Sequence, residues 1–185
     1  TMNTMAALGA ENSRGAATTL FLPQLEGERA PYWDPDLRGA FLGVSRQTLL
    51  PDFARSVYEG VAFAARQALE TLKISADVDS DIISCGGGGF RSQAWTQIRA
   101  DVLNKPLQRL TSGEPGISGA VTLAAIGTGM YSNFEEASTA LSQYRAPNIP
   151  DPEQVKIYAS VFEIYKDAIK ANANIGKRLT HLGEG

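Results

Sequence analysis

The chain has 185 residues, of which 43% are hydrophobic and 20% charged, a composition typical of soluble globular domains. A chain of this length can bury a substantial core, so intrinsic disorder, collagen-like repeats and small disulfide-stapled folds are excluded. Its 17 basic and 20 acidic residues give a net charge of -3. This balance argues against a dedicated nucleic-acid binder, because such proteins usually carry a basic excess.

Two residue counts narrow the chemistry further. Cys85 is the only cysteine and His181 the only histidine. A single cysteine excludes an intrachain disulfide and a cysteine-based zinc cluster, and one histidine near the C-terminus is a poor general base for Ser-His or Cys-His catalysis. The chain has no 18-residue apolar run and no signal-peptide pattern at its start. We therefore expect a cytoplasmic protein without membrane contact.

The first part of the chain combines a weakly patterned start with a long loop. Residues 1–17 are rich in small side chains and are expected to form a loose lead-in. Residues 18–22 (TTLFL) predict a short strand, which Pro23 ends. Residues 24–39 (QLEGERAPYWDPDLRG) mix prolines and glycines with charged and aromatic residues. Loops of this length are usually functional.

A strong helix is predicted to begin at Pro51, because the first helical turn tolerates the missing N–H of proline. Its apolar residues recur every three or four positions, which indicates one buried face. These residues are Val57, Val61, Ala65, Ala68 and Leu72. Gly60 lies inside this helix and costs about 1 kcal/mol relative to alanine. We expect a close backbone neighbour to compensate for that cost.

The remainder of the chain alternates strands with helices. Strands are expected at residues 81–85 and 106–110, with a turn over 113–116. Helices are expected from near Ser92, with Trp95, Ile98 and Val102 on one face, and over residues 117–130, 134–144 and 151–178. Such alternation predicts an α/β architecture in which helices pack on a mostly parallel sheet.

The most informative segment consists of a strand, four glycines and a helix, IISC-GGGG-FRSQAWTQIRADVL. Glycines let the backbone turn sharply and let a ligand approach without a Cβ in the way. The start of the next helix presents unpaired N–H groups and a partial positive charge, which suits a nucleotide or phosphate. The segment matches neither a Walker A loop nor a dinucleotide fingerprint. A tight turn without a ligand is the other interpretation of such a cluster.

Several further segments form a longer pattern with this one. They are residues 21–23 (FLP), 27–35 (GERAPYWDP), 38–43 (RGAFLG), 55–63 (RSVYEGVAF), 87–103 (GGGFRSQAWTQIRADVL) and 114–125 (EPGISGAVTLAA). In this order they resemble the C-terminal domain of the FGGY carbohydrate kinases, over roughly residues 20–179. Each segment alone is weak evidence for this family, whereas the whole set in this order is specific to it.

The resemblance implies a partial actin-like (ribonuclease H-like) ATPase domain over residues 18–185, the nucleotide-binding half of a sugar kinase. The start of that domain and the whole N-terminal sugar domain would lie outside this chain. The implied reaction transfers the γ-phosphate of ATP, with Mg²⁺, to a hydroxyl of a ketopentose such as xylulose. Gluconate, glycerol, ribulose and erythritol are alternative substrates. A non-catalytic actin-like assembly or binding module is the alternative outside enzymology.

The same resemblance assigns residues to the nucleotide. Gly87, Gly88 and Gly89 would pass beside the adenosine, and Ser92 would occupy the polar position that contacts the base. Arg91 is either a neighbour of the nucleotide or a solvated charge at the helix start. The family's catalytic aspartate and its two phosphate loops have no match here. Phosphoryl transfer depends on such positioning groups, so this chain alone is expected to be inactive.

Other candidate side chains have structural interpretations beside the functional ones. A charged cluster in the long loop is expected to pin that loop rather than to catalyse; it comprises Glu28, Arg29, Asp34, Asp36 and Arg38. Tyr32 and Trp33 are expected to be buried loop anchors, with stacking on a sugar as the alternative. Arg99 and Asp101 are expected on a solvated face or in an interhelix ion pair, and Trp95 in the core.

The last predicted helix carries an apolar stripe, namely Val155, Tyr158, Phe162, Tyr165 and Ile169. This stripe either packs within its own domain or mediates a homodimer. Both possibilities remain open from the sequence alone.

Overall fold

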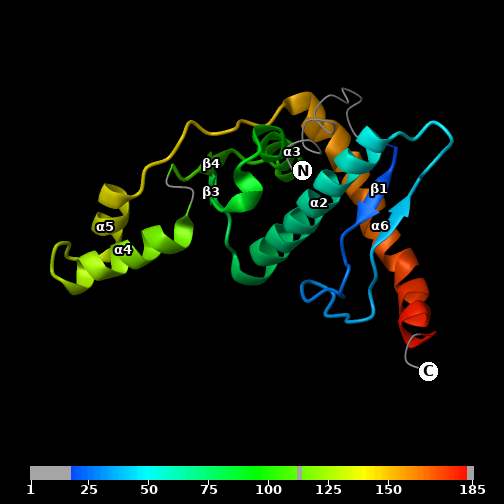
Figure 1. Cartoon of the computed structure of the whole chain (residues 1–185), viewed down its shortest axis with the longest axis horizontal. Coiled ribbons are helices and arrows are strands. Elements are labelled where there is room, and N and C mark those ends of the chain that lie inside the picture. Colours follow the sequence, from blue (N-terminus) through cyan, green and yellow to red (C-terminus); the bar gives the residue numbers. More distant parts are fainter. Residues whose placement is uncertain (1–17, 112–113, 183–185) are drawn as a thin grey trace.

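The computed structural model describes residues 18–111 and 114–182, so the lead-in expected over residues 1–17 lies outside the described residues. Figure 1 shows helices α2, α3 and α6 gathered beside strand β1, with α4 and α5 extending to one side. The elements are β1 (Leu20–Leu22), β2 (Ala40–Leu42), α2 (Leu50–Ala76), β3 (Ile83–Cys85), η1 (Gly88–Phe90), α3 (Gln93–Leu103), β4 (Leu107–Arg109), α4 (Pro115–Gly127), α5 (Phe134–Leu141) and α6 (Pro152–Leu182). No helix in these ranges is long and apolar enough to span a membrane.

One hydrophobic core joins β1, α2, α3 and α6. Its largest buried side chains include Phe63 of α2 and the α6 residues Tyr158, Phe162 and Tyr165. Their rings pack with centroids between 5.4 and 6.1 Å apart. The predicted α6 stripe is therefore occupied inside the chain, and it does not offer a surface to a second copy.

Helix α2 buries a different face from the predicted one. The residues of the expected stripe are half-buried from Val57 to Ala68, and Leu72 is exposed. The buried face instead carries Tyr58, Ala62 and Phe63, together with polar side chains. The prediction was wrong because apolar residues occur on both sides of α2. Apolar periodicity also assigns charged residues to the solvent, whereas here a charged pair is buried.

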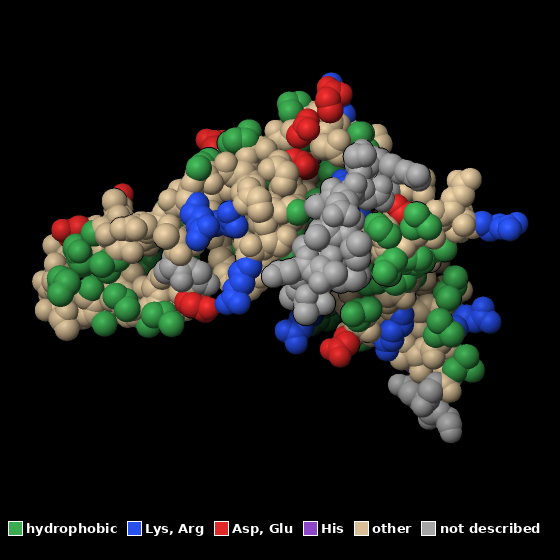
Figure 2. Space-filling model, turned by 45° about the horizontal axis from the view of Figure 1, so that its top comes forward, with side chains coloured by type: hydrophobic (Ala, Val, Ile, Leu, Met, Phe, Trp, Pro, Cys, Tyr) green, Lys and Arg blue, Asp and Glu red, His purple; other side chains and the backbone are tan. Residues whose placement is uncertain are grey.

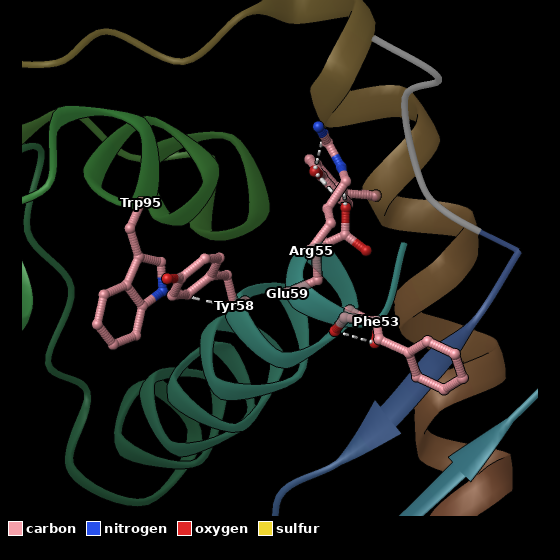
Figure 3. Close-up of polar contacts among 7 residues, drawn as sticks. Phe53, Arg55, Tyr58, Glu59 and Trp95 are labelled. Carbon is pink, nitrogen blue, oxygen red and sulfur yellow. Dashed lines mark hydrogen bonds and ion pairs between the residues drawn. The ribbon is translucent and has the colours of Figure 1, made fainter. Parts of the chain in front are cut away.

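Two buried charges on α2 form a polar triad with α6 (Figure 3). Arg55 Nε donates to Glu59 Oε1 at 2.7 Å, and Arg55 Nη2 donates to the Tyr158 hydroxyl at 2.8 Å. The Tyr158 hydroxyl in turn donates to Glu59 Oε1 at 2.8 Å. Burial is the main reason why the pKa of Tyr158 is raised, so its proton stays in place. Buried charges are tolerated when they are paired and hydrogen-bonded in this way.

The strands form two separate pairs among the described residues. β3 and β4 are parallel, with Cys85 opposite Arg109, and α3 is the crossover between them. β1 and β2 are antiparallel, with Phe21 opposite Phe41. The α/β class is confirmed, and parallel pairing is confirmed for β3 and β4. The antiparallel β2 was not predicted, because it has three residues with no buried side chain.

Helices α4 and α5 pack on one another and project from the rest of the molecule as an arm (Figure 1). After α5 the chain returns as an extended segment beside β4, bridged at Leu110 with Tyr144 and at Leu107 with Asn148. Leu107 and Asn148 exchange two backbone hydrogen bonds of 3.0 and 2.9 Å. This segment therefore extends the β3–β4 pair on its other edge.

Candidate functional site

The glycine run turns the chain from β3 into α3. Gly87 has φ +90° and ψ 178°, a backbone conformation that only glycine adopts readily. Gly88 to Phe90 then form the short 3₁₀ helix η1, whose N–H groups at Phe90 and Arg91 donate to Gly87 O and Gly88 O. The strand–glycine–helix order predicted from the sequence is confirmed.

The four glycines differ in what surrounds them. A Cβ on Gly86 would collide with the ring of Pro115, and a Cβ on Gly89 would lie 3.3 Å from the Arg99 guanidinium. A Cβ on Gly87 or Gly88 would have no described atom within 4 Å. Space beside the loop is therefore open at these two positions, where a ligand can reach the backbone.

Two guanidinium groups fix the glycine loop by donating hydrogen bonds to its carbonyl groups. Arg99 donates to Gly89 O at 3.2 Å and lies 3.8 Å from the centre of the Trp95 ring and 4.3 Å from that of Phe90. Arg109 Nη1 donates to Phe90 O at 3.0 Å. Burial lowers the pKa of Arg99, and the two aromatic faces stabilise its charge. Arg99 thus supports the loop, is half-buried and has no ion pair with a described residue. The expectation of a solvated face or an interhelix ion pair was therefore wrong for Arg99.

Helix α3 is fixed at its start and along its length. The Ser92 hydroxyl accepts a hydrogen bond from Trp95 N at 3.3 Å and caps the helix, which stabilises a helix by about 1 kcal/mol. The Trp95 indole donates to Tyr58 O of α2 at 3.3 Å, and the two rings lie 4.9 Å apart (Figure 3). Trp95 is packed against the core as expected. Ser92 lies at the end of the glycine loop, where its O–H remains able to donate.

Asp101 of α3 positions the start of α6. Its Oδ1 accepts hydrogen bonds from Asp151 N and from Gln97 Nε2, both at 2.8 Å. Asp101 is buried, and burial raises the pKa of its carboxyl group against the opposing effect of these two bonds. The expectation of a solvated face or an ion pair was wrong for this residue, since its partners are an amide and a backbone N–H.

Arg91 precedes helix α3 and is the charged residue that the sequence analysis named beside the glycine run. Its Nη2 lies 3.5 Å from Glu114 Oε1, and both side chains are exposed. Exposed pairs of this kind are worth little, so Arg91 remains able to turn toward a ligand. Both interpretations given for Arg91 are compatible with this arrangement.

The long loop over residues 24–39 is pinned by polar contacts, as expected. Asp34 Oδ1 accepts from Asp36 N at 2.9 Å, Arg38 Nη1 donates to two backbone carbonyls at 2.8 Å, and Gln24 Nε2 donates to Glu28 at 3.2 Å. Tyr32 packs against the core and accepts a hydrogen bond from Gln67.

Trp33 in the same loop corrects the prediction of a buried anchor. Its side chain is 78% exposed, at a residue with φ +50°. Tyr32 is half-buried against the core, and the chain reverses at the next residue, so the Trp33 ring points outward.

Arg109 and Arg145 were missed by the sequence analysis. Arg109 ends β4 directly opposite Cys85, and Arg145 N donates to Arg109 O at 2.9 Å. Arg109 could have been identified from the sequence, because a basic residue at the end of the predicted second parallel strand lies at the same sheet edge as the glycine loop. Arg145 is brought there by an irregular segment, which no periodicity marks.

No group of three or more His, Cys, Asp or Glu side chains that could hold a metal ion occurs within residues 18–111 and 114–182. These residues therefore do not fit a metal site of their own. The open glycines fit a nucleotide better, because a ligand can occupy the space that a Cβ would take at Gly88.

Comparison with known proteins identifies the family. Residues 2–128 match the family described as FGGY family of carbohydrate kinases, C-terminal domain. A xylulose kinase of Staphylococcus epidermidis is 35% identical over 172 residues, covering 91% of this chain and 34% of that protein. A glycerol kinase of Enterococcus casseliflavus is 28% identical over 95% of this chain and 34% of that protein.

Solved structures agree with this match. A Brucella ovis kinase described as a xyloylose kinase superposes with a TM-score of 0.84 at 28% identity, over 94% of this chain and 35% of its own. A ligand-bound xylulose kinase from Lactobacillus acidophilus gives 0.81 at 27% identity, over 92% and 34%. The chain therefore belongs to the FGGY family of carbohydrate kinases and has the actin-like fold of their C-terminal domain. It spans about a third of the length of the curated relatives it matches.

Proposed function

We propose that this member of the FGGY family supplies the nucleotide-binding half of an ATP-dependent sugar kinase. ATP and ADP would lie along Gly87, Gly88 and Gly89, with Ser92 at the base. The acceptor would be a hydroxyl of a ketopentose such as xylulose, bound mainly by a domain that precedes these residues in the relatives. Gluconate, glycerol, ribulose and erythritol are the alternative acceptors. Cytoplasmic location and a homodimer belong to the same proposal.

The observation that carries the proposal is the open backbone at Gly88, next to a glycine at φ +90°. A turn that served only to connect β3 with α3 would have no need of a vacant position there. The loop is also held in place before any ligand arrives, because Arg99 and Arg109 bind its carbonyl groups. Preorganisation of this kind lowers the entropic cost of binding.

The residues of this chain would have three tasks with a bound nucleotide. Gly87 and Gly88 would let the nucleotide approach the backbone, Ser92 would donate or accept at the base, and α3 would direct its N-terminal partial charge toward anionic groups. The nucleotide supplies the transferable phosphoryl group. Mg²⁺ would come with the phosphates, since this ion commonly binds through substrate phosphates and few carboxylates.

The test is calorimetric titration of ADP into the 185-residue chain and its Gly88→Val variant. A Cβ at this position has no described atom within 4 Å, so the fold should persist in the valine variant while ADP affinity is lost. Gly127→Val is the matched control, because its Cβ also has open space and it lies at the end of α4. Equal ADP affinity in wild type and Gly88→Val would refute the assigned site.

The same titration separates the enzymatic proposal from an assembly module. A module that only packs with partners would bind no nucleotide and would self-associate instead. Saturable ADP binding that Gly88→Val removes favours the kinase half. Self-association measured by ultracentrifugation, without ADP binding in a folded chain, favours the module.

A further inference from the structure

A separate feature lies at the start of the glycine loop. A cavity of about 170 Å³ opens there between β4, the return segment and the loop, and three arginines contribute to its wall. Its lining includes Gly86, Gly87, Thr111, Arg91, Arg109 and Arg145. Gly88, Gly89 and Ser92 do not line it. The cavity therefore shares Gly87 with the proposed nucleotide contacts and extends from there toward β4 and the return segment.

The backbone brings two of the arginines together. The parallel register sets Arg109 at the end of β4, and Arg145 N donates to Arg109 O at 2.9 Å. Thr111 N donates to Gln143 O at 2.8 Å, which continues the same antiparallel contact. Figure 2 shows basic side chains gathered where the α4–α5 arm joins the rest of the molecule. The sheet edge thus holds like charges side by side, an unfavourable arrangement without an anion.

The charge of this cavity is not balanced by described carboxylates. The two Nη groups of Arg109 donate hydrogen bonds to neutral partners, Phe90 O and Gln93 Oε1. Its buried Nε has no hydrogen-bond partner among the described residues. The side chain of Arg145 has no hydrogen bond or ion pair with any described residue. Glu114 is the single carboxylate with a described contact to the three, 3.5 Å from Arg91.

We propose that this cavity, hereafter the arginine pocket, binds a phosphate group. Guanidinium groups match phosphate oxygens in geometry and charge better than other side chains do. The volume corresponds to five or six waters at about 30 Å³ each, which is enough for a phosphate and its immediate substituent. The phosphate would belong either to the nucleotide on the neighbouring glycines or to a separate phosphorylated small molecule. Only the first of these sources rests on the proposed function.

The test compares the wild-type chain with Arg145→Ala at constant ionic strength, using inorganic phosphate, ADP and adenosine as probes in calorimetry. Arg145 is exposed and has no described side-chain partner, so its truncation should leave the fold intact. Arg178→Ala on α6 is the matched control, because it removes the same charge from an exposed site far along the chain. Circular dichroism checks both variants for folding.

The expected result is that Arg145→Ala weakens phosphate binding about tenfold, as for the loss of one charge-assisted hydrogen bond, while Arg178→Ala leaves it unchanged. A parallel tenfold loss for ADP, with adenosine unaffected, identifies the nucleotide as the source. Unchanged ADP affinity identifies a separate phosphorylated ligand. Absence of phosphate binding, or equal phosphate affinity in Arg145→Ala and wild type, overturns the proposal. Loss of adenosine binding in Gly88→Val tests the nucleotide site independently of this pocket.

Discussion

Gly60 is the position where the packing makes the sharpest quantitative prediction. In the interior of an exposed helix, replacing glycine by alanine stabilises the helix by about 1 kcal/mol. In α2 the added Cβ would lie 2.3 Å from the Phe21 carbonyl oxygen and 3.1 Å from the Phe21 ring. Normal van der Waals separation would require α2 and β1 to move apart by about 1 Å. The obstacle is backbone, so no side-chain rotation relieves it.

The cost of that movement decides the sign. Overpacking in a well-packed core costs about 1–3 kcal/mol, and both Gly60 and Phe21 belong to the buried contact between α2 and β1. Because the obstacle at 2.3 Å is backbone, the upper part of this range applies, about 2–3 kcal/mol. After subtracting the helix-propensity gain of about 1 kcal/mol, Gly60→Ala should lower the free energy of unfolding by about 1–2 kcal/mol. The expected close backbone neighbour of Gly60 is confirmed, and it is the Phe21 carbonyl.

The assay is urea unfolding followed by circular dichroism, in which a lower midpoint at unchanged slope reports reduced stability. Gly119→Ala is the matched control, because it is also a helix-interior glycine and its Cβ would have open space. This control should be neutral or stabilising by up to about 1 kcal/mol. Gly60→Ala that is as stable as wild type would refute the reasoning, since the contact between α2 and β1 would then be looser than described.

Four further predictions concern buried polar groups, the loop and turnover. Tyr158→Phe should lower the free energy of unfolding by about 1–3 kcal/mol in chemical denaturation, because the Tyr158 hydroxyl bridges two charged groups. Tyr165→Phe loses one neutral hydrogen bond from Gln24 and should cost only about 0.5–1.5 kcal/mol. A larger loss for Tyr165→Phe than for Tyr158→Phe would count against the triad. The raised pKa of Asp101 means that the folded state holds this proton more tightly, so its contribution to stability falls as pH rises from the ordinary carboxyl range through the raised pKa. Asp101→Asn should therefore become progressively more stable relative to wild type as pH rises from 4 to 7, and a constant difference would contradict this. Trp33→Ala should change the free energy of unfolding by less than about 0.5 kcal/mol, and a larger loss would show that the exposed ring is packed. The chain alone should give no xylulose-dependent ATP turnover in a coupled ADP assay, and turnover would place a catalytic base within these residues.

Helix positions and the strand–glycine–helix unit were predictable because they rest on local signals. Proline and serine are both favoured at the start of a helix. Helix α2 begins at Leu50 and α3 at Gln93, each within a residue or two of the predicted start. β2 was not predictable, since its pairing with β1 depends on a chain reversal through the 24–39 loop rather than on its own three residues.

The buried face of α2 required information from a distant helix. Arg55 and Glu59 interact as a pair four residues apart, which in sequence is typical of a solvated helix face. They are buried because Tyr158, more than ninety residues later, completes their hydrogen bonds. No local pattern contains that third partner, so a rule based on apolar spacing selects the wrong side of the helix.

The glycine run shows the same limit at the site itself. Four consecutive glycines predict a sharp turn from strand to helix, but each glycine has a different structural reason to be there. Gly86 accommodates Pro115, Gly87 adopts a backbone conformation closed to other residues, and Gly89 accommodates Arg99. Gly88 alone has neither a close neighbour nor a positive φ, so the fold itself does not demand glycine at this position. Gly88 is therefore the position where substitution separates ligand binding from folding.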